Sequence, residues 1–391
     1  MPALGSHFLV CGAGLGGLTA ALALQRHGFK VSVLEQAPTL GEVGAGITLA
    51  PNATRVLDAL GLEHQLAAIG TVPAKQAIKH YRTGESLVSV DRKDNSKARY
   101  GAAYYVAHRA DIHAALVEAV RGNDPSALVV SARVTALDQD GSKVRATLAD
   151  GRRVVGDGLI AADGVKSVVR DRLFSPQPPR FTGYLAWRGL VPTAQLPPGV
   201  IDPPADLSIA PGRMFARYLL RRDTLLNYVA IAEVDAWQEE GWTIASDPAE
   251  VRAAFADFHA ETQLIMAATR PDQCHKWGLF EHAPLRSWVR GRVALLGDAA
   301  HAMTPFMGQG AAMAIEDAMV LARCLFSFDD VETALHRYER ARLDRTAFVA
   351  AESMAKGKRM LARETDSYGK NRHRNEESLG LFEYDALRVP I

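Results

Sequence analysis

Three groups of glycine and acidic residues are the parts of this 391-residue sequence whose types and spacing could do chemistry. The first is GAGLGG, which begins at Gly12 and ends at Gly17. In a dinucleotide-binding motif the first glycine makes the turn, the third (here Gly14) lets a pyrophosphate approach the backbone, and the sixth lets the helix pack closely. Glu35 comes eighteen residues after Gly17, near the spacing of roughly 20 at which an acid binds an adenosine ribose. The pattern predicts dinucleotide binding, with NAD and FAD both open; a glycine-rich structural turn is the alternative.

The other two groups, ADG and GDAAH, each come at the end of an apolar segment. ADG ends at Gly164 with Arg170 beyond it, and GDAAH ends at His301 with a proline and GQG after it. Their acids, proline and outer glycines are Asp163, Asp298, Pro305, Gly308 and Gly310. An aspartate at a strand end suits a hydrogen bond from a sugar hydroxyl, whereas a helix cap or a surface ion pair is the alternative.

The elements that position these groups follow from hydrophobic patterning. Short apolar runs at His7–Cys11 and Lys30–Leu34 predict buried parallel strands, and Leu15–His27 between them predicts a helix. Residues 176–235 alternate apolar and polar side chains and predict a separate antiparallel sheet. Long helices are expected from Gly308 to about Leu361.

Composition and charge exclude several classes of protein. Hydrophobic residues make up 48% of the chain and charged residues 23%, as in globular proteins rather than disordered ones. The balance of 45 basic and 44 acidic residues offers no broad attraction to nucleic acid or to a membrane surface. The N-terminus lacks a basic region before its apolar segment, and no uninterrupted apolar run approaches the roughly 20 residues of a membrane span. We therefore expect a cytoplasmic protein, with Cys11, Cys274 and Cys324 as reduced thiols.

Taken in order, the three groups resemble those of the FAD-dependent aromatic hydroxylases, which include salicylate, 6-hydroxynicotinate and para-hydroxybenzoate hydroxylases. The resemblance runs from Phe8 to about Leu325. It implies that NAD(P)H, as a transient reductant, reduces FAD and that O2 adds to the flavin as a C4a-hydroperoxide, which hydroxylates a phenolic or hydroxylated N-heteroaromatic acid. Whether decarboxylation accompanies hydroxylation stays open. No second GxGxxG is present, which agrees with a reductant that has no Rossmann domain of its own.

The resemblance also implies a fold, namely an α/β Rossmann-like FAD-binding domain interleaved with an antiparallel-sheet substrate domain, followed by C-terminal helices. The FAD-binding domain is expected at residues 1–70, 100–175 and 280–325, the substrate domain at 71–99 and 176–279, and the helices and tail at 326–391. The residues expected to bind the cofactor are Gly12, Gly14, Leu15, Gly17, Glu35, Gln36, Gly46, Arg109, Val134, Asp163, Asp298, Gly308, Gly310 and Ala311.

The substrate residues are expected on and near the strand Arg213–Leu220. Side chains alternate along a strand, so Met214 and Tyr218 share one face and Arg217 lies on the other. Tyr218 resembles the tyrosine that orients the substrate hydroxyl in the family, although simple packing on the sheet is an equal alternative. The other expected residues are Arg188 and Arg217 as ligands of a carboxylate, Met214 in the pocket, and Pro305, Phe306 and Met307 at the oxygen-reacting face.

Two departures leave the base that deprotonates the substrate unassigned. Some hydroxynicotinate enzymes have a histidine where this chain has Thr48, and some hydroxybenzoate enzymes have one at Met214. His301 is expected to be structural. The alternative functions are an FAD dehydrogenase or reductase that inserts no oxygen, and a flavin-binding protein without turnover. No metal is expected, the partner is a small aromatic molecule, and the chain is a monomer or a homodimer.

Overall fold

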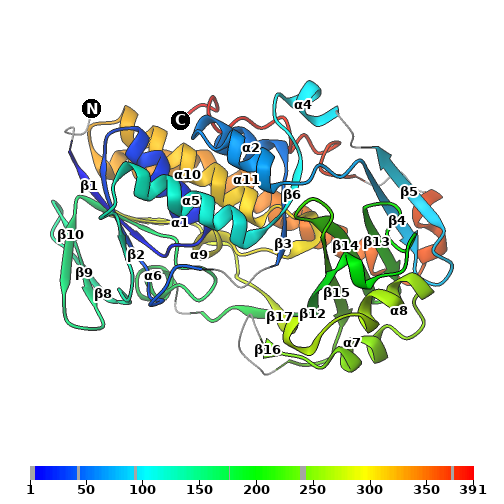
Figure 1. Ribbon diagram of the computed structural model, residues 1–391. Helices are drawn as coiled ribbons and strands as arrows, with labels where there is room; N and C mark the ends of the chain where they lie inside the picture. Colours follow the sequence, from blue (N-terminus) through cyan, green and yellow to red (C-terminus); the bar gives the residue numbers. More distant parts are fainter. Residues whose placement is uncertain (1–4, 42–44, 92–94, 176, 238–243, 371–373) are drawn as a thin grey trace.

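The computed structural model describes residues 5–41, 45–91, 95–175, 177–237, 244–370 and 374–391. Within these ranges the strands form four sheets. Figure 1 shows the molecule as two bodies side by side. A six-stranded sheet occupies one body and an eight-stranded sheet occupies the other.

The six-stranded sheet has the order β18-β19-β11-β1-β2-β7. Its strands are β1 (His7–Cys11), β2 (Lys30–Leu34), β7 (Leu128–Val129), β11 (Gly158–Ala161), β18 (Val289–Arg290) and β19 (Val293–Leu295). All neighbours pair in parallel except β18 and β19. Strands β1 and β11 are almost wholly buried, because a parallel sheet is covered on both faces.

Helices cover one face of this sheet, and a small sheet lies on the opposite side (Figure 1). The covering helices are α1 (Leu15–Arg26), α5 (Arg109–Asn123), α10 (Gly310–Ser327) and α11 (Val331–Met360). The small sheet contains β8 (Val134–Gln139), β9 (Val144–Leu148) and β10 (Arg153–Gly156). The long helices expected from Gly308 to about Leu361 are α10, which begins at Gly310, and α11, and residues 328–330 separate them.

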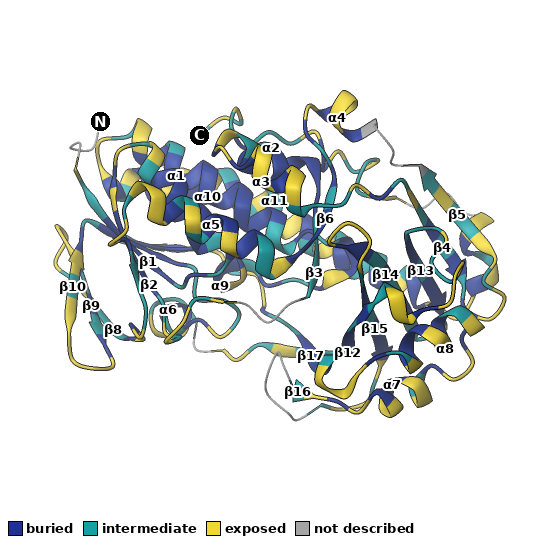
Figure 2. Cartoon of the chain, viewed as in Figure 1, coloured by how far each residue is buried: buried dark blue, intermediate teal, exposed yellow. Residues whose placement is uncertain are grey.

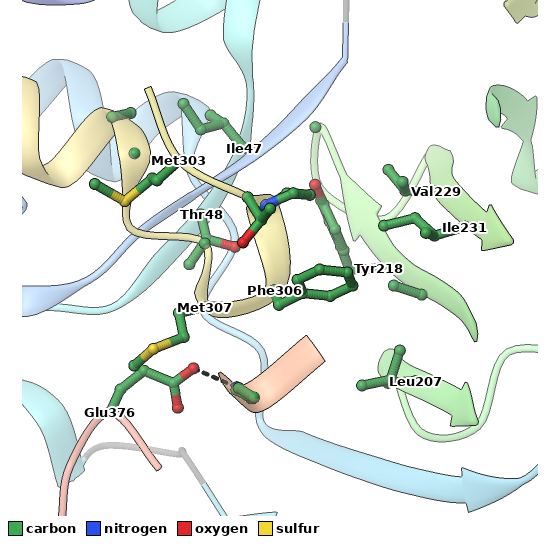
Figure 3. Close-up of a pocket in the computed structure, with 18 of the residues that line it drawn as sticks. Ile47, Thr48, Leu207, Tyr218, Val229, Ile231, Met303, Phe306, Met307 and Glu376 are labelled. Atoms are coloured by element: carbon green, nitrogen blue, oxygen red, sulfur yellow. Dashed lines mark hydrogen bonds and ion pairs between the residues drawn. The ribbon is translucent and has the colours of Figure 1, made fainter. Parts of the chain in front are cut away.

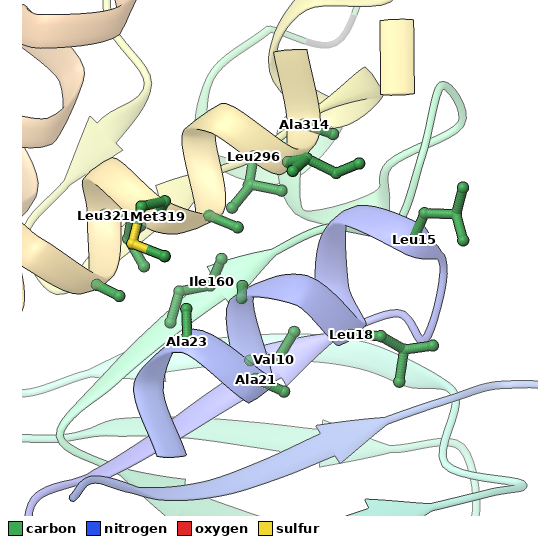
Figure 4. Packing of buried hydrophobic residues seen from close by; sticks show 14 of the residues in the cluster. Val10, Leu15, Leu18, Ala21, Ala23, Ile160, Leu296, Ala314, Met319 and Leu321 are labelled. Atoms are coloured by element: carbon green, nitrogen blue, oxygen red, sulfur yellow. The ribbon is translucent and has the colours of Figure 1, made fainter. Parts of the chain in front are cut away.

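Small side chains allow α1 and α10 to pack closely across β1 and β11. Figure 4 shows Ala21 and Ala23 of α1 together with Ala314 and Met319 of α10. A Cβ atom on Gly16 would lie 2.9 Å from Leu296 and 3.1 Å from Ala314, so a larger residue there would push the helices apart. Both helices are largely buried in Figure 2, and together with the sheet they form the main hydrophobic core.

The eight-stranded sheet has the order β16-β17-β12-β15-β14-β13-β4-β5. Its strands are β4 (Lys75–His80), β5 (Ser86–Asp91), β12 (Arg180–Pro192), β13 (Ala205–Ala210), β14 (Arg213–Leu220), β15 (Leu225–Glu233), β16 (Ile244–Ala245) and β17 (Cys274–Glu281). Neighbouring strands are antiparallel except β13 and β4, which pair in parallel. The antiparallel sheet expected from residues 176–235 is confirmed in β12 to β15, and the parallel junction arises where β4, from far earlier in the sequence, joins β13.

The remaining elements connect the two bodies or cover the second sheet. Strands β3 (Gly46–Leu49) and β6 (Tyr105–His108) form a two-stranded ribbon between them. The other helices are α2 (Pro51–Ala59), α3 (Glu63–Ile69), α4 (Asn95–Tyr100), α6 (Val168–Leu173), α7 (Pro248–Ala254), α8 (Ala260–Ala267) and α9 (Asp298–His301). Short 3-10 turns lie at η1 (Thr193–Gln195), η2 (Pro271–Gln273), η3 (Pro305–Met307) and η4 (Thr365–Lys370). No helix of the described residues is long and apolar enough to cross a membrane.

The end of the chain packs back onto the helices of the first body. Phe382 is fully buried, and Arg55 donates a hydrogen bond of 2.7 Å to the backbone oxygen of Tyr384. Arg323 donates to the backbone oxygens of Ala386 and Val389. The apolar tail therefore docks on its own chain.

Candidate active site

A cavity of about 1030 Å³ lies between the two bodies. Its lining comes from the loops after β1 and β19, from the ribbon β3, from one face of the eight-stranded sheet, and from the chain beyond α10. Single ligand pockets measure roughly 300–1,000 Å³, so this cavity has room for a large cofactor and a small substrate together.

The glycine turn after β1 contributes two different kinds of glycine. Gly12 has a φ of +100°, and a Cβ there would lie 2.5 Å from the backbone oxygen of Ala162. A Cβ on Gly17 would overlap the backbone oxygen of Gly12. Gly14, in contrast, lines the cavity, and a Cβ there would meet no protein atom within 4 Å. Gly12 and Gly17 are thus required by the fold, whereas Gly14 leaves space that a ligand can use.

Glu35 lies beside this turn and is held by the backbone. Its carboxylate accepts hydrogen bonds of 2.8 Å from the amides of Ala13 and Ala37. Each carboxylate oxygen has a second lone pair, so Glu35 can still accept a ribose hydroxyl. The expected cofactor residues that do not line the main cavity are Gly12, Gly17, Glu35, Gln36, Val134 and Asp163. Those that do are Gly14, Leu15, Gly46, Arg109, Asp298, Gly308, Gly310 and Ala311.

Arg170 joins the second and third sequence groups. Its buried guanidinium donates hydrogen bonds of 3.1 Å to the backbone oxygens of Ala299 and Ala300, in the helix that Asp298 begins. Asp298 itself is exposed toward the cavity. The carboxylate of Asp163 accepts a long hydrogen bond of 3.4 Å from the amide of Val169. Burial raises the pKa of this carboxyl despite a hydrogen bond from Ser167. The arginine therefore fixes the loop that presents Asp298.

Helix α10 points its N-terminus at the cavity. Gly308 was expected to begin this helix, but it ends the turn η3 with a φ of +61°. Helix α10 begins two residues later, at Gly310. Asn52 donates a hydrogen bond of 3.1 Å to Gln309, which lies between these glycines. The first turn of an 18-residue helix offers free N–H groups and a positive dipole end to any ligand in front of it.

His301 is part of the support beneath this loop and not of the cavity wall. Its Nε2 atom lies 2.6 Å from Asp317, whose other oxygen accepts a hydrogen bond of 2.7 Å from Arg342. Burial opposes the charge on Asp317, but His301 and Arg342 together lower the pKa of its carboxyl. Among the described residues no histidine lines the cavity.

Tyr218 lies against the strand β3 at the centre of the cavity. A Cβ on Gly46 would overlap its ring, and the amide of Gly46 donates a hydrogen bond of 2.8 Å to Asn227 on the neighbouring strand β15. Burial raises the pKa of the Tyr218 phenol, so the hydroxyl stays neutral at ordinary pH and can donate a hydrogen bond. Figure 3 draws Tyr218 beside Thr48 and Phe306.

The sheet side of the cavity is apolar. Strand alternation places Met214, Ala216 and Tyr218 on the cavity face, as the sequence predicts, while Phe215 and Leu219 join the core under α7 and α8. The apolar residues around the cavity are Ile78, Val88, Val90, Leu207, Met214, Val229, Ile231, Phe306, Met307 and Met360 (Figure 3).

The expectation that Arg217 binds a substrate carboxylate is not supported. Arg217 borders the cavity with its strand, but its guanidinium is buried on the opposite face of the sheet. There it pairs with Asp206 at 2.7 Å and with Glu261 of α8, close to Lys79. Two carboxylates already neutralise this cation. Its ion pair with Glu261 connects α8 to the sheet.

Arg188 is also outside the cavity lining. Its strand register gives it the same face as Val229, but its guanidinium lies over the ring of Trp277 at 5.5 Å. Burial and the charge of Arg109 lower the pKa of Arg188. The Nε and Nη2 atoms of Arg188 are buried and have no hydrogen-bond partner among the described residues, and its expected contact with a substrate carboxylate stays a prediction.

Several lining residues were not expected from the sequence. They are Ile47, Thr48, Gln76, Tyr104, Gly164, Met303, Thr304, Lys356, Tyr368, Arg374, Asn375, Glu376 and Ser378. Thr48 and Gly164 adjoin motifs that the sequence singles out, so their place in the cavity lining could have been predicted. The residues beyond 350 carry no local signal, because they reach the cavity only through the packing of α11 and of the chain that follows it. The described residues contain no group of three or more His, Cys, Asp or Glu that could hold a metal ion.

Comparisons with known proteins agree with this geometry. Residues 6–353 match the family model described as FAD binding domain. The chain is 36% identical to 6-hydroxynicotinate 3-monooxygenase of Pseudomonas fluorescens over 388 residues, which covers 98% of this chain and 96% of that protein. It is 37% identical to 3-hydroxybenzoate 6-hydroxylase 1 of Aquipseudomonas alcaligenes over 350 residues, covering 89% and 88%.

A solved structure is similar over nearly the whole chain. HpxO of Klebsiella pneumoniae, in complex with FAD and uric acid, superimposes with a TM-score of 0.84 at 27% identity and covers 97% of this chain and 95% of that one. A salicylate hydroxylase substrate complex has a TM-score of 0.82 at 22% identity, with 99% of each chain covered, and supports the fold alone.

Proposed function

The chain belongs to the family of FAD-dependent aromatic hydroxylases, and from this premise we propose that it hydroxylates the ring of a phenolic or hydroxylated N-heteroaromatic acid. It is an FAD-dependent monooxygenase that uses NAD(P)H and O2. The observation that supports the substrate class best is the cavity, which joins the glycine and aspartate turns of the first body to the wall around Tyr218.

The residues present fit FAD. The space in front of Gly14 and the N-terminus of α1 suit a pyrophosphate, because backbone N–H groups there attract anions. Asp298 can accept a hydrogen bond from the ribityl chain, and Arg109 lines the same part of the cavity. Gly310 and Ala311 would hold the pyrimidine edge of the ring, where the positive end of α10 stabilises negative charge on reduced flavin. Gly12, Gly17, Glu35, Gln36, Val134 and Asp163 would support the adenosine end of the cofactor.

When bound, FAD takes up electrons from NAD(P)H and uses O2 to transfer one oxygen atom to the ring. The protein then has to hold the ring, keep water out and control one proton. Tyr218 would donate or accept a hydrogen bond at the substrate hydroxyl, since its neutral phenol can do both. Pro305, Phe306, Met307 and Met214 would form the walls that keep the ring in place and the site dry.

The finer organisation is also proposed. We assign residues 1–70, 100–175 and 280–325 to the FAD-binding unit, 71–99 and 176–279 to the substrate unit, and 326–391 to the C-terminal helices and tail. Membership of β4 and β5 in the eight-stranded sheet supports this division. We further propose that the chain works in the cytoplasm as a monomer or a homodimer, without nucleic acid.

A panel of hydroxylated benzoates and pyridine carboxylates tests the proposal. We expect at least one acid to accelerate NAD(P)H oxidation by the FAD-loaded protein by about 10-fold or more. The reason is that the aromatic ring of the substrate must be bound before oxidation of NAD(P)H can lead to hydroxylation. Mass spectrometry of the organic product should show one added oxygen atom, alone or with loss of CO2.

Two other outcomes would replace the proposal by a different function. Accelerated NAD(P)H oxidation with all oxygen recovered as hydrogen peroxide would indicate a reductase or oxidase. Retention of FAD with no NAD(P)H oxidation across the panel would indicate a flavin-binding protein without turnover.

A further inference from the structure

A substrate acid needs a cation in the cavity, and the cations of its described lining can be compared one by one. Arg109 lines the cavity and is assigned to FAD in the proposed function, and the guanidinium of Arg217 faces α8. The side chain of Arg374 is 62% exposed and pairs with Glu352. Lys356 lines the cavity with a side chain that is only 16% exposed. Of these four, Lys356 is the cation best placed to meet a small acid beside the apolar wall.

Helix α11 is fixed against the loop that faces the oxygen-reacting side of the cavity. Ser353 donates a hydrogen bond of 2.7 Å to the backbone oxygen of Thr304, and the two hydroxyls lie 3.2 Å apart. One turn later Gly357 allows the ring of Phe306 to contact the helix, because any Cβ there would overlap that ring. Lys356 therefore lies next to Phe306 on a rigid element, as a residue that positions a substrate should.

Lys356 already forms an ion pair with a carboxylate of the same chain. The ammonium pairs with Glu376, whose side chain is 12% exposed, and Figure 3 shows Glu376 beside Met307. Asn375 and Ser378 exchange two hydrogen bonds of 2.9 and 2.8 Å around Glu376, which fixes the turn that presents it. An ammonium has three donors, so Glu376 leaves capacity for a second carboxylate.

We propose that Lys356 is the carboxylate-binding residue of the substrate site, and that Glu376 is an internal competitor that holds the ammonium in place when no substrate is bound. This inference rests on the proposed function, since it assumes that the substrate is an acid. It places the substrate hydroxyl toward Tyr218 and the carboxylate toward the C-terminal segment, with Leu207 and Ile231 along the ring.

Opposite effects of two substitutions test the proposal. The measurement is equilibrium binding to the FAD-loaded protein, followed by flavin fluorescence, with 3-hydroxybenzoate and 6-hydroxynicotinate as probes, each compared with its carboxamide. Lys356→Met should raise the dissociation constant of the acids by about 10- to 100-fold, as loss of a charge-assisted hydrogen bond does. The carboxamides should change by less than about 3-fold. Glu376→Gln should tighten binding of the acids by roughly 3- to 10-fold, because a like charge is removed.

Matched controls separate recognition from folding. Lys358→Met changes an exposed lysine of the same helix and should leave all four dissociation constants unchanged. Lys356→Arg keeps the positive charge and should restore most of the preference for acids. If the residues act only on structure, both Lys356→Met and Glu376→Gln would weaken acids and carboxamides alike, and the proposal would be wrong.

Two further results would also overturn it, namely no preference for acid over carboxamide in the unsubstituted protein, or an unchanged preference in Lys356→Met. Failure of the proposed function has a different signature. In that case no probe yields an oxygenated product, whatever its affinity for the site.

Discussion

Gly14→Val should produce a folded protein that no longer retains FAD. Gly14 has a φ of −72° and a ψ of 179°, which valine adopts without strain, and a Cβ there would meet no protein atom within 4 Å. The added methyl groups would enter the space that a pyrophosphate needs. We expect the dissociation constant of FAD to rise by at least about 100-fold, which corresponds to about 2.7 kcal/mol.

The measurement is a titration of apoprotein with FAD, followed by flavin fluorescence, together with thermal unfolding of the apoprotein. Gly122→Val is the matched control, because this glycine of α5 also meets no atom within 4 Å but lies away from the cavity. Gly17→Val should instead unfold the turn, since its side chain would overlap the backbone of Gly12. Normal FAD affinity of Gly14→Val would contradict the placement of the cofactor.

Tyr218→Phe should separate NAD(P)H consumption from hydroxylation. Phenylalanine keeps the ring that packs on Gly46, so folding and FAD binding should be preserved, but the substrate hydroxyl loses its partner. Loss of a positioned proton donor or acceptor typically costs a factor of 10² to 10⁴, so we expect hydroxylation to slow by about 100-fold. Oxidation of NAD(P)H should slow much less, and the difference should appear as hydrogen peroxide.

Tyr228→Phe is the matched control for this experiment. Tyr228 is fully buried, and a Cβ on Gly189 would overlap its ring just as one on Gly46 would overlap that of Tyr218. Its hydroxyl, however, lies on the other face of the sheet, 3.2 Å from Thr269. The ratio of product to NAD(P)H should therefore be normal in Tyr228→Phe. An equal ratio in both variants would remove Tyr218 from the mechanism.

The sequence predicts the first body well because its signals are local. A strand of five residues of which four are apolar, a turn that only glycine can make and a small-residue helix follow one another between His7 and Arg26, and each is fixed by its neighbours in the chain. Strand alternation likewise separates Tyr218 from Arg217 correctly, because the period of two holds along the whole of β14.

The carboxylate-binding cation could not be predicted in the same way. An arginine on the pocket strand is an obvious candidate by residue type, but Arg217 is neutralised by Glu261, which comes 44 residues later. Lys356 and Glu376 lie in a region whose mixed charges read as a solvated helix and tail. Tertiary contacts of Ser353 with Thr304 and of Gly357 with Phe306 bring this helix to the cavity, and nothing local in the sequence encodes them.

Isotope labelling tests the central claim most directly. The FAD-loaded protein should be supplied with NAD(P)H, the most strongly stimulating acid of the panel and ¹⁸O₂, and the organic product analysed by mass spectrometry. The account predicts one ¹⁸O atom in the new ring hydroxyl. A product without ¹⁸O, or recovery of all the consumed oxygen as hydrogen peroxide with every acid tested, would contradict it.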